Sequence, residues 1–285
     1  LFPIVGITTE TPFKFKYFKS NFTITPKSHI VLTPGISNSN KISNEDSTNN
    51  DFSIENNYRL NRYSGNDKLD NSKRLTFGLD THTENFKTSL TQTYEFTDNS
   101  NFHKEQGNVN NLSDILGSIE YEKEFTINYD FRYDVNLEYL KNQNLKINTT
   151  SKIGDVELFY LDQQSKSDGI INKDSETINY NFKSKRLAKF SKINLNGLYD
   201  LKKEINTEYG IGYSYFDECF GISLDFNRKS YKEDELKPQD ILTLMFSFKN
   251  VGSYKSSNLS LSNNNQEDIN WESTNIDEDM FLDYE

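Results

Sequence analysis

Hydrophobic and polar residues alternate strictly through one segment near the middle of the chain, residues 125–139. Every odd position is apolar or aromatic, from Phe125 to Tyr139, and every even position between them is polar. Side chains alternate between the two faces of a strand, so the pattern predicts a single two-faced β-strand. Such a strand spans roughly 50 Å, whereas ordinary strands have about 5–6 residues. This length is typical of a large extended sheet or of a membrane-spanning barrel.

Shorter alternating segments recur along the chain and predict an antiparallel meander of about twelve or thirteen strands. Short turns alternate with longer connections such as 97–113, 162–176 and 229–240. This alternation is typical of outer-membrane barrels, in which the turns are periplasmic and the loops extracellular. A soluble β-sandwich remains an alternative at this point, although it would more often have shorter strands. The further predicted strands are 13–17, 22–24, 75–83, 86–96, 115–121, 145–153, 156–161, 177–183, 190–201, 204–216, 219–228 and 241–248.

Two stretches show no hydrophobic periodicity. Residues 35–57 are rich in Asn, Ser, Asp and Glu and predict an exposed loop. Residues 253–285 are acidic and low in complexity, with only scattered apolar positions. The predicted organisation is therefore a β-barrel portion over 1–252, followed by an acidic, mostly disordered tail over 253–285.

The composition is polar on average yet rich in aromatic residues. Mean hydropathy is -0.80 and 34% of residues are hydrophobic, but 14% are aromatic. A barrel with a watery interior and an apolar skin one residue thick has this profile. No run of about 18 apolar residues occurs, so the sequence predicts no transmembrane helix. A net charge of -11 argues against nucleic acid as a partner.

The sequence gives no sign of catalysis. The three histidines, His29, His82 and His103, lack the spacing of a metal site. Neither a glycine-rich phosphate loop nor a G-x-S-x-G elbow is present. We therefore expect a protein with no catalytic residues, no metal and no cofactor.

Three ordered motifs resemble the LptD family of lipopolysaccharide (LPS) assembly proteins. Residues 61–67, NRYSGND, followed by 74–79, RLTFGL, resemble that family's N-R-F-S-G-x-D-R … R-x-x-Y-G-L segment. Residues 213–220, YSYFDECF, resemble its Y-x-x-D-x-C turn, and residues 238–252 resemble its closing strand. Pro12, Phe13, Thr25 and Pro26 fit the same order, so the resemblance covers about residues 1–252.

The resemblance implies an outer-membrane β-barrel that assembles LPS into the outer leaflet of Gram-negative bacteria, with a lateral opening between its first and last strands. It implies a plug lipoprotein of the LptE type, a periplasmic LPS-bridge protein that docks on an N-terminal domain, and surrounding membrane lipid as partners. We expect this chain to be the C-terminal part of the barrel. Two alternatives are a porin or receptor barrel of the outer membrane and a surface β-sheet adhesion protein.

The motif residues have structural and functional interpretations. Arg62, Asp67 and Arg74 are expected to form a salt-bridge cluster that orders a long loop, with direct substrate contact as the alternative. Gly65 and Gly78 are expected to be required for the local backbone conformation rather than for function. The remaining motif positions are Ser64, Asp217, Pro238, Asp240 and Gly252.

Cys219 is the single cysteine of the chain. The family has two consecutive cysteines at this position, which bond to its N-terminal domain, whereas here Phe220 takes the second place. Cys219 is therefore either bonded to a cysteine outside this chain or a free thiol.

The barrel interpretation assigns opposite roles to the faces of residues 125–139. The odd positions are expected to face lipid over the roughly 9–11 residues that a tilted strand needs to cross a bilayer. The even positions Asp130, Arg132 and Asp134 are expected to face the lumen. Removal of the Arg132 side chain is expected to be mild.

Overall fold

The computed structural model describes residues 3–17, 20–35, 53–65, 67–97, 108–109, 111–185, 190–230, 238–249, 251–256, 259–260 and 271–274. The chain divides into two compact units. Unit 1 contains Leu1–Leu145 and Asp162–Asp174, and unit 2 contains Lys146–Leu161 and Ser175–Glu285. The division passes through three strands, β10 (Tyr139–Thr150), β11 (Gly154–Ser167) and β12 (Ile170–Ser184).

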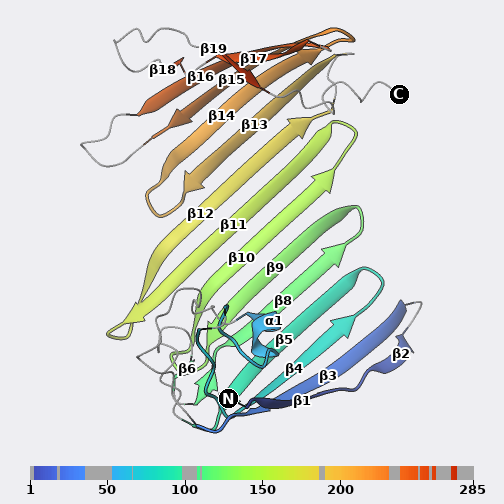
Figure 1. The fold of residues 1–285 in the computed structure, drawn as a ribbon, viewed down its shortest axis with the longest axis vertical. Coiled ribbons are helices and arrows are strands. Elements are labelled where there is room, and N and C mark those ends of the chain that lie inside the picture. The colour runs from blue at the N-terminus through green and yellow to red at the C-terminus, as the bar shows by residue number, and fades with distance from the viewer. Residues whose placement is uncertain are drawn as a thin grey trace. The chain divides into compact units, whose positions relative to one another are not determined.

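Unit 1 is built on antiparallel strands that follow one another along the chain (blue to green in Figure 1). Strand β3 pairs with β1, β2 and β4, and the pairing then runs from β4 to β5, β8 and β9. The bounds are β1 (Val5–Glu10), β2 (Phe13–Tyr17), β3 (Ser20–Leu32), β4 (Arg74–His82), β5 (Phe86–Glu95), β6 (Asn108–Val109), β7 (Leu112–Ser113), β8 (Ile115–Glu122) and β9 (Phe125–Asp134).

One short helix, α1 (Ile54–Asn57), interrupts the strands of unit 1 and lies against β5. Its N-cap is Ser53, whose hydroxyl accepts a hydrogen bond from the amide of Asn56 at 3.1 Å. Among the described residues, no helix combines the length and the apolar character that are needed to cross a bilayer.

Unit 2 continues the antiparallel pattern, with pairing from β12 through β13, β14, β15 and β16 to β17 and β19. Its further strands are β13 (Ser191–Asp200), β14 (Ile205–Phe216), β15 (Phe220–Lys229), β16 (Gln239–Phe248), β17 (Gly252–Ser256), β18 (Leu259–Ser260) and β19 (Trp271–Thr274). Apart from the one-turn helix α1, the regular structure of the described residues is therefore antiparallel β-sheet, as the alternating pattern predicts.

The sheet of unit 1 has a polar face and an apolar face. The strand registers place Thr76, Thr93 and Leu116 on the polar face, where all three side chains are buried. Large hydrophobic residues occupy the opposite face and are exposed. This distribution is the reverse of a soluble core, and it fits a sheet whose apolar face meets lipid. Exposed members of the apolar face include Ile7, Ile30, Leu32, Phe77, Leu79, Leu90 and Phe125.

The sheet of unit 2 shows the same division. Asn194, Gly212, Asp225 and Thr243 lie opposite one another in successive strands and share one face. The other face carries exposed hydrophobic side chains in the same strands. Those side chains include Leu195, Tyr209, Ile211, Tyr213, Leu224 and Phe248.

The prediction of one long strand over 125–139 is wrong. Strand β9 ends at Asp134, and β10 begins at Tyr139 after a tight turn. Oδ1 of Asp134 accepts hydrogen bonds from the amides of Asn136 and Leu137, both at 2.9 Å, and Glu138 has a φ of 57°. This side-chain capping of the turn overrides the alternation that continues through it. Tyr139, which was expected to face lipid, is buried.

The predicted long loop at 162–176 is also absent. Strands β11 and β12 extend through it and are joined by a two-residue turn, Asp168-Gly169. Both residues have positive φ, 52° and 78°, as a type I′ hairpin requires. Asp-Gly is a strong hairpin signal, so the sequence does contain the information for this turn.

The expected boundary of the C-terminal tail falls within a strand. Residues Gly252–Ser256 form β17, which pairs with β16 and β19. Most of the remaining tail lies outside the described residues, and so does most of the predicted loop at 35–57, apart from α1 and its flanks.

Candidate functional site

A loop crosses the polar face of unit 1 between α1 and β4 and brings Arg62 to the sheet. Nδ2 of Asn56, in α1, donates to the carbonyl of Arg62 at 3.2 Å. The side chain of Asn61 closes the loop, because its Oδ1 accepts from the amide of Asp70 at 3.0 Å and its Nδ2 donates to the carbonyl of Lys68 at 3.1 Å. These hydrogen bonds fix the described parts of the loop, residues 58–65 and 67–73, between α1 and β4.

Five buried polar residues join this loop to the sheet, and we call them the Arg62 cluster: Arg62, Asp70, Ser72, Arg74 and Glu95. Nε of Arg62 lies 2.6 Å from Oδ2 of Asp70, and its Nη2 lies 3.1 Å from Oε2 of Glu95. Nη1 of Arg74 donates to the same Asp70 oxygen at 2.8 Å. The hydroxyl of Ser72 donates to Glu95. All five side chains are at most 1% exposed.

Electrostatics stabilise the charge of Arg62. Burial by itself lowers the pKa of Arg62, but the carboxylates of Asp70 and Glu95 outweigh it, so the pKa is raised. Beside it, burial raises the pKa of Tyr63 to about 12. Two arginines and two carboxylates balance in charge, and this balance is what allows charged groups to be buried.

A second ion-pair group lies on the polar face at the ends of β8, β9 and β10, and we call it the Asp114 network: Asp114, Arg132, Asp134 and Lys141. Nε of Arg132 lies 2.6 Å from Oδ2 of Asp114, and Nζ of Lys141 lies 3.1 Å from the same oxygen. Lys141 also lies 2.7 Å from Oδ2 of Asp134. Both carboxylates are nearly inaccessible to solvent.

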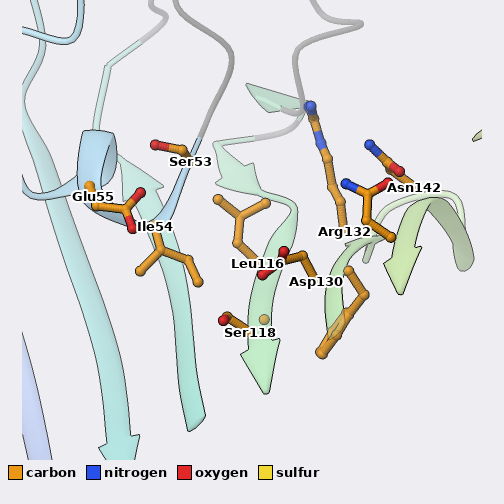
Figure 2. A pocket seen from close by; sticks show the side chains of 11 residues that line it. Ser53, Ile54, Glu55, Leu116, Ser118, Asp130, Arg132 and Asn142 are labelled. Carbon is orange, nitrogen blue, oxygen red and sulfur yellow. The ribbon is translucent and has the colours of Figure 1, made fainter. Parts of the chain in front are cut away.

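A cavity of about 400 Å³ opens beside the Asp114 network in unit 1 (Figure 2). The start of α1 forms one side of it, and β8, β9 and β10 form the other sides. Ile54 and Leu116 supply an apolar wall and pack with Tyr63. The polar side chains that line the cavity are Ser53, Glu55, Ser118, Asp130, Arg132, Asn142 and Asn144.

No cluster of metal ligands occurs within the part of the chain that the structure describes. The polar groups named so far are arranged in ion pairs and hydrogen bonds that fix a loop and line a cavity. The family comparison shows to which class of protein this arrangement belongs. A family model described as "LPS transport system D", LptD, matches residues 1–236.

The chain belongs to the LptD family. LptD proteins are β-barrels of the outer membrane that act in LPS transport and assembly, together with other Lpt components. The chain thus has its role in LPS transport at the outer membrane. None of the curated proteins compared with the chain matches it.

The first LptD motif of the chain folds into the Arg62 cluster. The structure brings Arg62 and Arg74 together on the carboxylate of Asp70. Asp67 and Ser64 lie on the same loop and are partly exposed, and Gly65 takes a φ of 81°. Asp70, Ser72 and Glu95 belong to none of the sequence motifs and were not predicted as site residues. The position of Glu95 on the polar face of a predicted strand was a signal that could have identified it.

Gly78 lies on the polar face of β4, under the loop. A Cβ atom at this position would collide with the hydroxyl of Tyr58 and would lie 2.7 Å from the carbonyl oxygen of Leu90. The absence of a side chain is therefore what lets the Tyr58 ring approach the sheet.

The later LptD motifs lie in unit 2. Asp217 forms the turn between β14 and β15, where its Oδ1 accepts from the amides of Cys219 and Phe220 at 2.9 Å and 2.7 Å. These amides lower the pKa of Asp217. Cys219 is exposed, and it is a free thiol in this structure.

The closing-strand motif, residues 238–252, lies entirely beyond the matched residues 1–236. Pro238 immediately precedes β16, a position at which its missing N–H costs no sheet pairing. Asp240 lies 3.5 Å from Nε of Arg228 on the neighbouring strand. Gly252 begins β17 with a φ of 144°. The resemblance of 238–252 to the family's closing strand stays a prediction.

Proposed function

We propose that the chain forms part of the wall of a barrel that delivers LPS to the outer leaflet of the Gram-negative outer membrane. The sugar portion passes along the polar faces of the sheet, and the acyl chains leave sideways through an opening between the first and last strands of the barrel. Neither movement makes or breaks a covalent bond, so the protein needs no catalytic residue or cofactor.

The division of each sheet into a polar and an apolar face is the observation that carries this proposal. In unit 1, buried charges such as Arg74, Glu95 and Asp114 lie on the face opposite exposed Phe77 and Leu90. In hydrocarbon every backbone polar group must be paired within the protein, which antiparallel strands achieve. The apolar face would then contact lipid. The polar face, with Asp130, Arg132 and Asp134, would line the lumen.

The proposed partners are those that the resemblance to the LptD family implies. A plug lipoprotein of the LptE type would occupy the lumen, and a periplasmic LPS-bridge protein would dock on an N-terminal domain. We also propose that Cys219 pairs with a cysteine outside this chain, which its exposed position in a turn supports. Comparison of the electrophoretic mobility of the full-length protein with and without reductant tests this bond. An unchanged mobility would refute it.

Depletion of the protein, followed by measurement of LPS at the cell surface, tests the function. We expect surface LPS to fall and LPS to accumulate at earlier stages of the transport route. Reintroduction of the wild-type gene should restore LPS at the cell surface. Unchanged surface LPS together with a reduced uptake of small solutes would contradict the proposal and would indicate a passive porin.

A further inference from the structure

The cavity beside α1 has the lining of a binding site for a sugar ring. Two sides of it differ in character: Ile54 and Leu116 form an apolar wall, while side chains of β9 and β10 present amides and charges (Figure 2). A pyranose has the same division, because its C–H groups form an apolar face and its hydroxyls both donate and accept hydrogen bonds. The volume of about 400 Å³ lies in the range of small-molecule sites, roughly 300–1,000 Å³.

Three buried polar atoms of the lining residues have no hydrogen-bond partner among the described residues. They are Nη2 of Arg132 and the Oδ1 atoms of Asn142 and Asn144. Buried polar groups in proteins are generally hydrogen-bonded, and an unpaired one destabilises the fold. The side-chain oxygens of Asn142 and Asn144 thus lie in the cavity wall without a hydrogen bond to other described residues. They are available to accept hydrogen bonds from a ligand.

The charges of the cavity disfavour an anionic ligand. Glu55 and Asp130 contribute two carboxylates to the lining. The one lining cation, Arg132, is already paired with Asp114 at 2.6 Å. A phosphate in the cavity would face the carboxylates of Glu55 and Asp130, whereas the positive charge of Arg132 is already offset by Asp114, so like-charge repulsion disfavours a phosphate. The lining therefore suits a neutral ligand with several hydroxyls.

We propose that this cavity binds a neutral sugar residue of the LPS saccharide during its passage, with Asp130, Asn142 and Asn144 holding its hydroxyls and Ile54 and Leu116 its apolar face. The inference rests on the proposed function, because the cavity opens on the polar face that would line the lumen. It adds a selectivity for neutral over phosphorylated sugars.

Saturation-transfer NMR on the full-length protein in detergent, with methyl α-mannoside and mannose 6-phosphate as probes, tests the inference. We expect saturable binding of the neutral sugar and at least tenfold weaker binding of the phosphorylated one. The double variant Asp130→Ala/Asn144→Ala should lose at least tenfold in affinity for the neutral sugar. Asn128→Ala is the matched control, since it removes an amide from the same face of β9 outside the lining and should leave binding unchanged.

A charge variant makes the test sharper. Asp130→Asn keeps the shape of the side chain but removes its negative charge. It should therefore strengthen the binding of mannose 6-phosphate and reduce the difference in affinity between the two sugars. Far-UV circular dichroism and heat-modifiable gel mobility verify the fold of each variant, and Asn144→Ala alone replaces any double variant that misfolds. Equal binding of both sugars, no saturable binding by the wild type, or undiminished binding by the folded alanine variants would overturn the inference. Surface LPS after depletion is a separate measurement, so these results leave the proposed function standing.

Discussion

The Arg62 cluster allows a quantitative prediction. Substitution Arg62→Met keeps much of the side-chain volume but removes both ion pairs of the guanidinium. Asp70 retains Arg74 at 2.8 Å, whereas Glu95 keeps the Ser72 hydroxyl as its named partner. Because the Glu95 carboxylate is 1% exposed, it cannot regain the lost interaction from water. Breaking a buried pair in this way costs about 3–5 kcal/mol.

A second substitution tests the cause. In Arg62→Met/Glu95→Gln the side chain left without its arginine partner is a neutral amide at position 95. An unpaired buried neutral group costs only about 1–3 kcal/mol. The double variant should therefore be more stable than the single variant. The exposed pair Lys87–Glu120 is the control, since its side chains are 52% and 35% exposed and Lys87→Ala should cost less than about 1 kcal/mol.

Two assays report on these variants. Urea unfolding of the full-length protein in detergent gives the change in unfolding free energy, and chymotrypsin cleavage after Tyr58 or Tyr63 reports opening of the loop. A local loss of about 3 kcal/mol raises the open population, and hence cleavage, roughly 100-fold. A stabilising role of the buried Arg62 ion pairs is refuted if Arg62→Met changes both measurements no more than Lys87→Ala does, or if Arg62→Met/Glu95→Gln is less stable than Arg62→Met.

Three further predictions concern the faces of the sheet and the turn in unit 2. Phe131→Arg places a charge on the apolar face and should destabilise the membrane-inserted protein by about 2–4 kcal/mol if the residue lies near the bilayer midplane. Asn128→Arg, on the polar face of the same strand, should cost less than about 1 kcal/mol. Equal losses of stability in urea titrations would show that the two faces of β9 have been assigned wrongly. Gly78→Ala should cost about 1–3 kcal/mol through overpacking, and Tyr58→Ala should recover part of that loss in the double variant. In reduced protein, Cys219 should react with a maleimide without denaturant, because its side chain is exposed; labelling that requires urea would contradict this exposure.

Strict alternation in the sequence was sufficient to predict the class of the fold and most strands, but it could not locate every strand end. Within residues 125–139 the apolar and polar positions alternate through the turn as well as through the strand. The structure ends the strand at Asp134 because one carboxylate oxygen caps two successive amides. That interaction depends on a turn geometry that periodicity does not encode. The Asp168-Gly169 turn, in contrast, was available from the sequence through its dipeptide.

The residues of the candidate site were also only partly predictable from the sequence. The sequence motif identified Arg62 and Arg74, but their shared carboxylate belongs to Asp70, and the second carboxylate comes from Glu95, 33 positions beyond Arg62. Contacts over such separations follow from strand register, which the sequence alone leaves open. Arg132 illustrates the consequence: its removal was expected to be mild, yet its 2.6 Å ion pair with a buried carboxylate makes it part of the Asp114 network.

The burial of the Arg62 cluster affects how its ion pairs respond to dissolved salt. The ionic strength around a protein of the outer membrane varies with the surrounding medium. Dissolved salt screens exposed charges strongly, but it acts weakly on pairs from which water and ions are excluded. Since these side chains are at most 1% exposed, the attachment of the loop to β4 and β5 should hold equally in dilute and in saline media. This part of the protein should therefore keep its structure when the ionic strength of the medium changes.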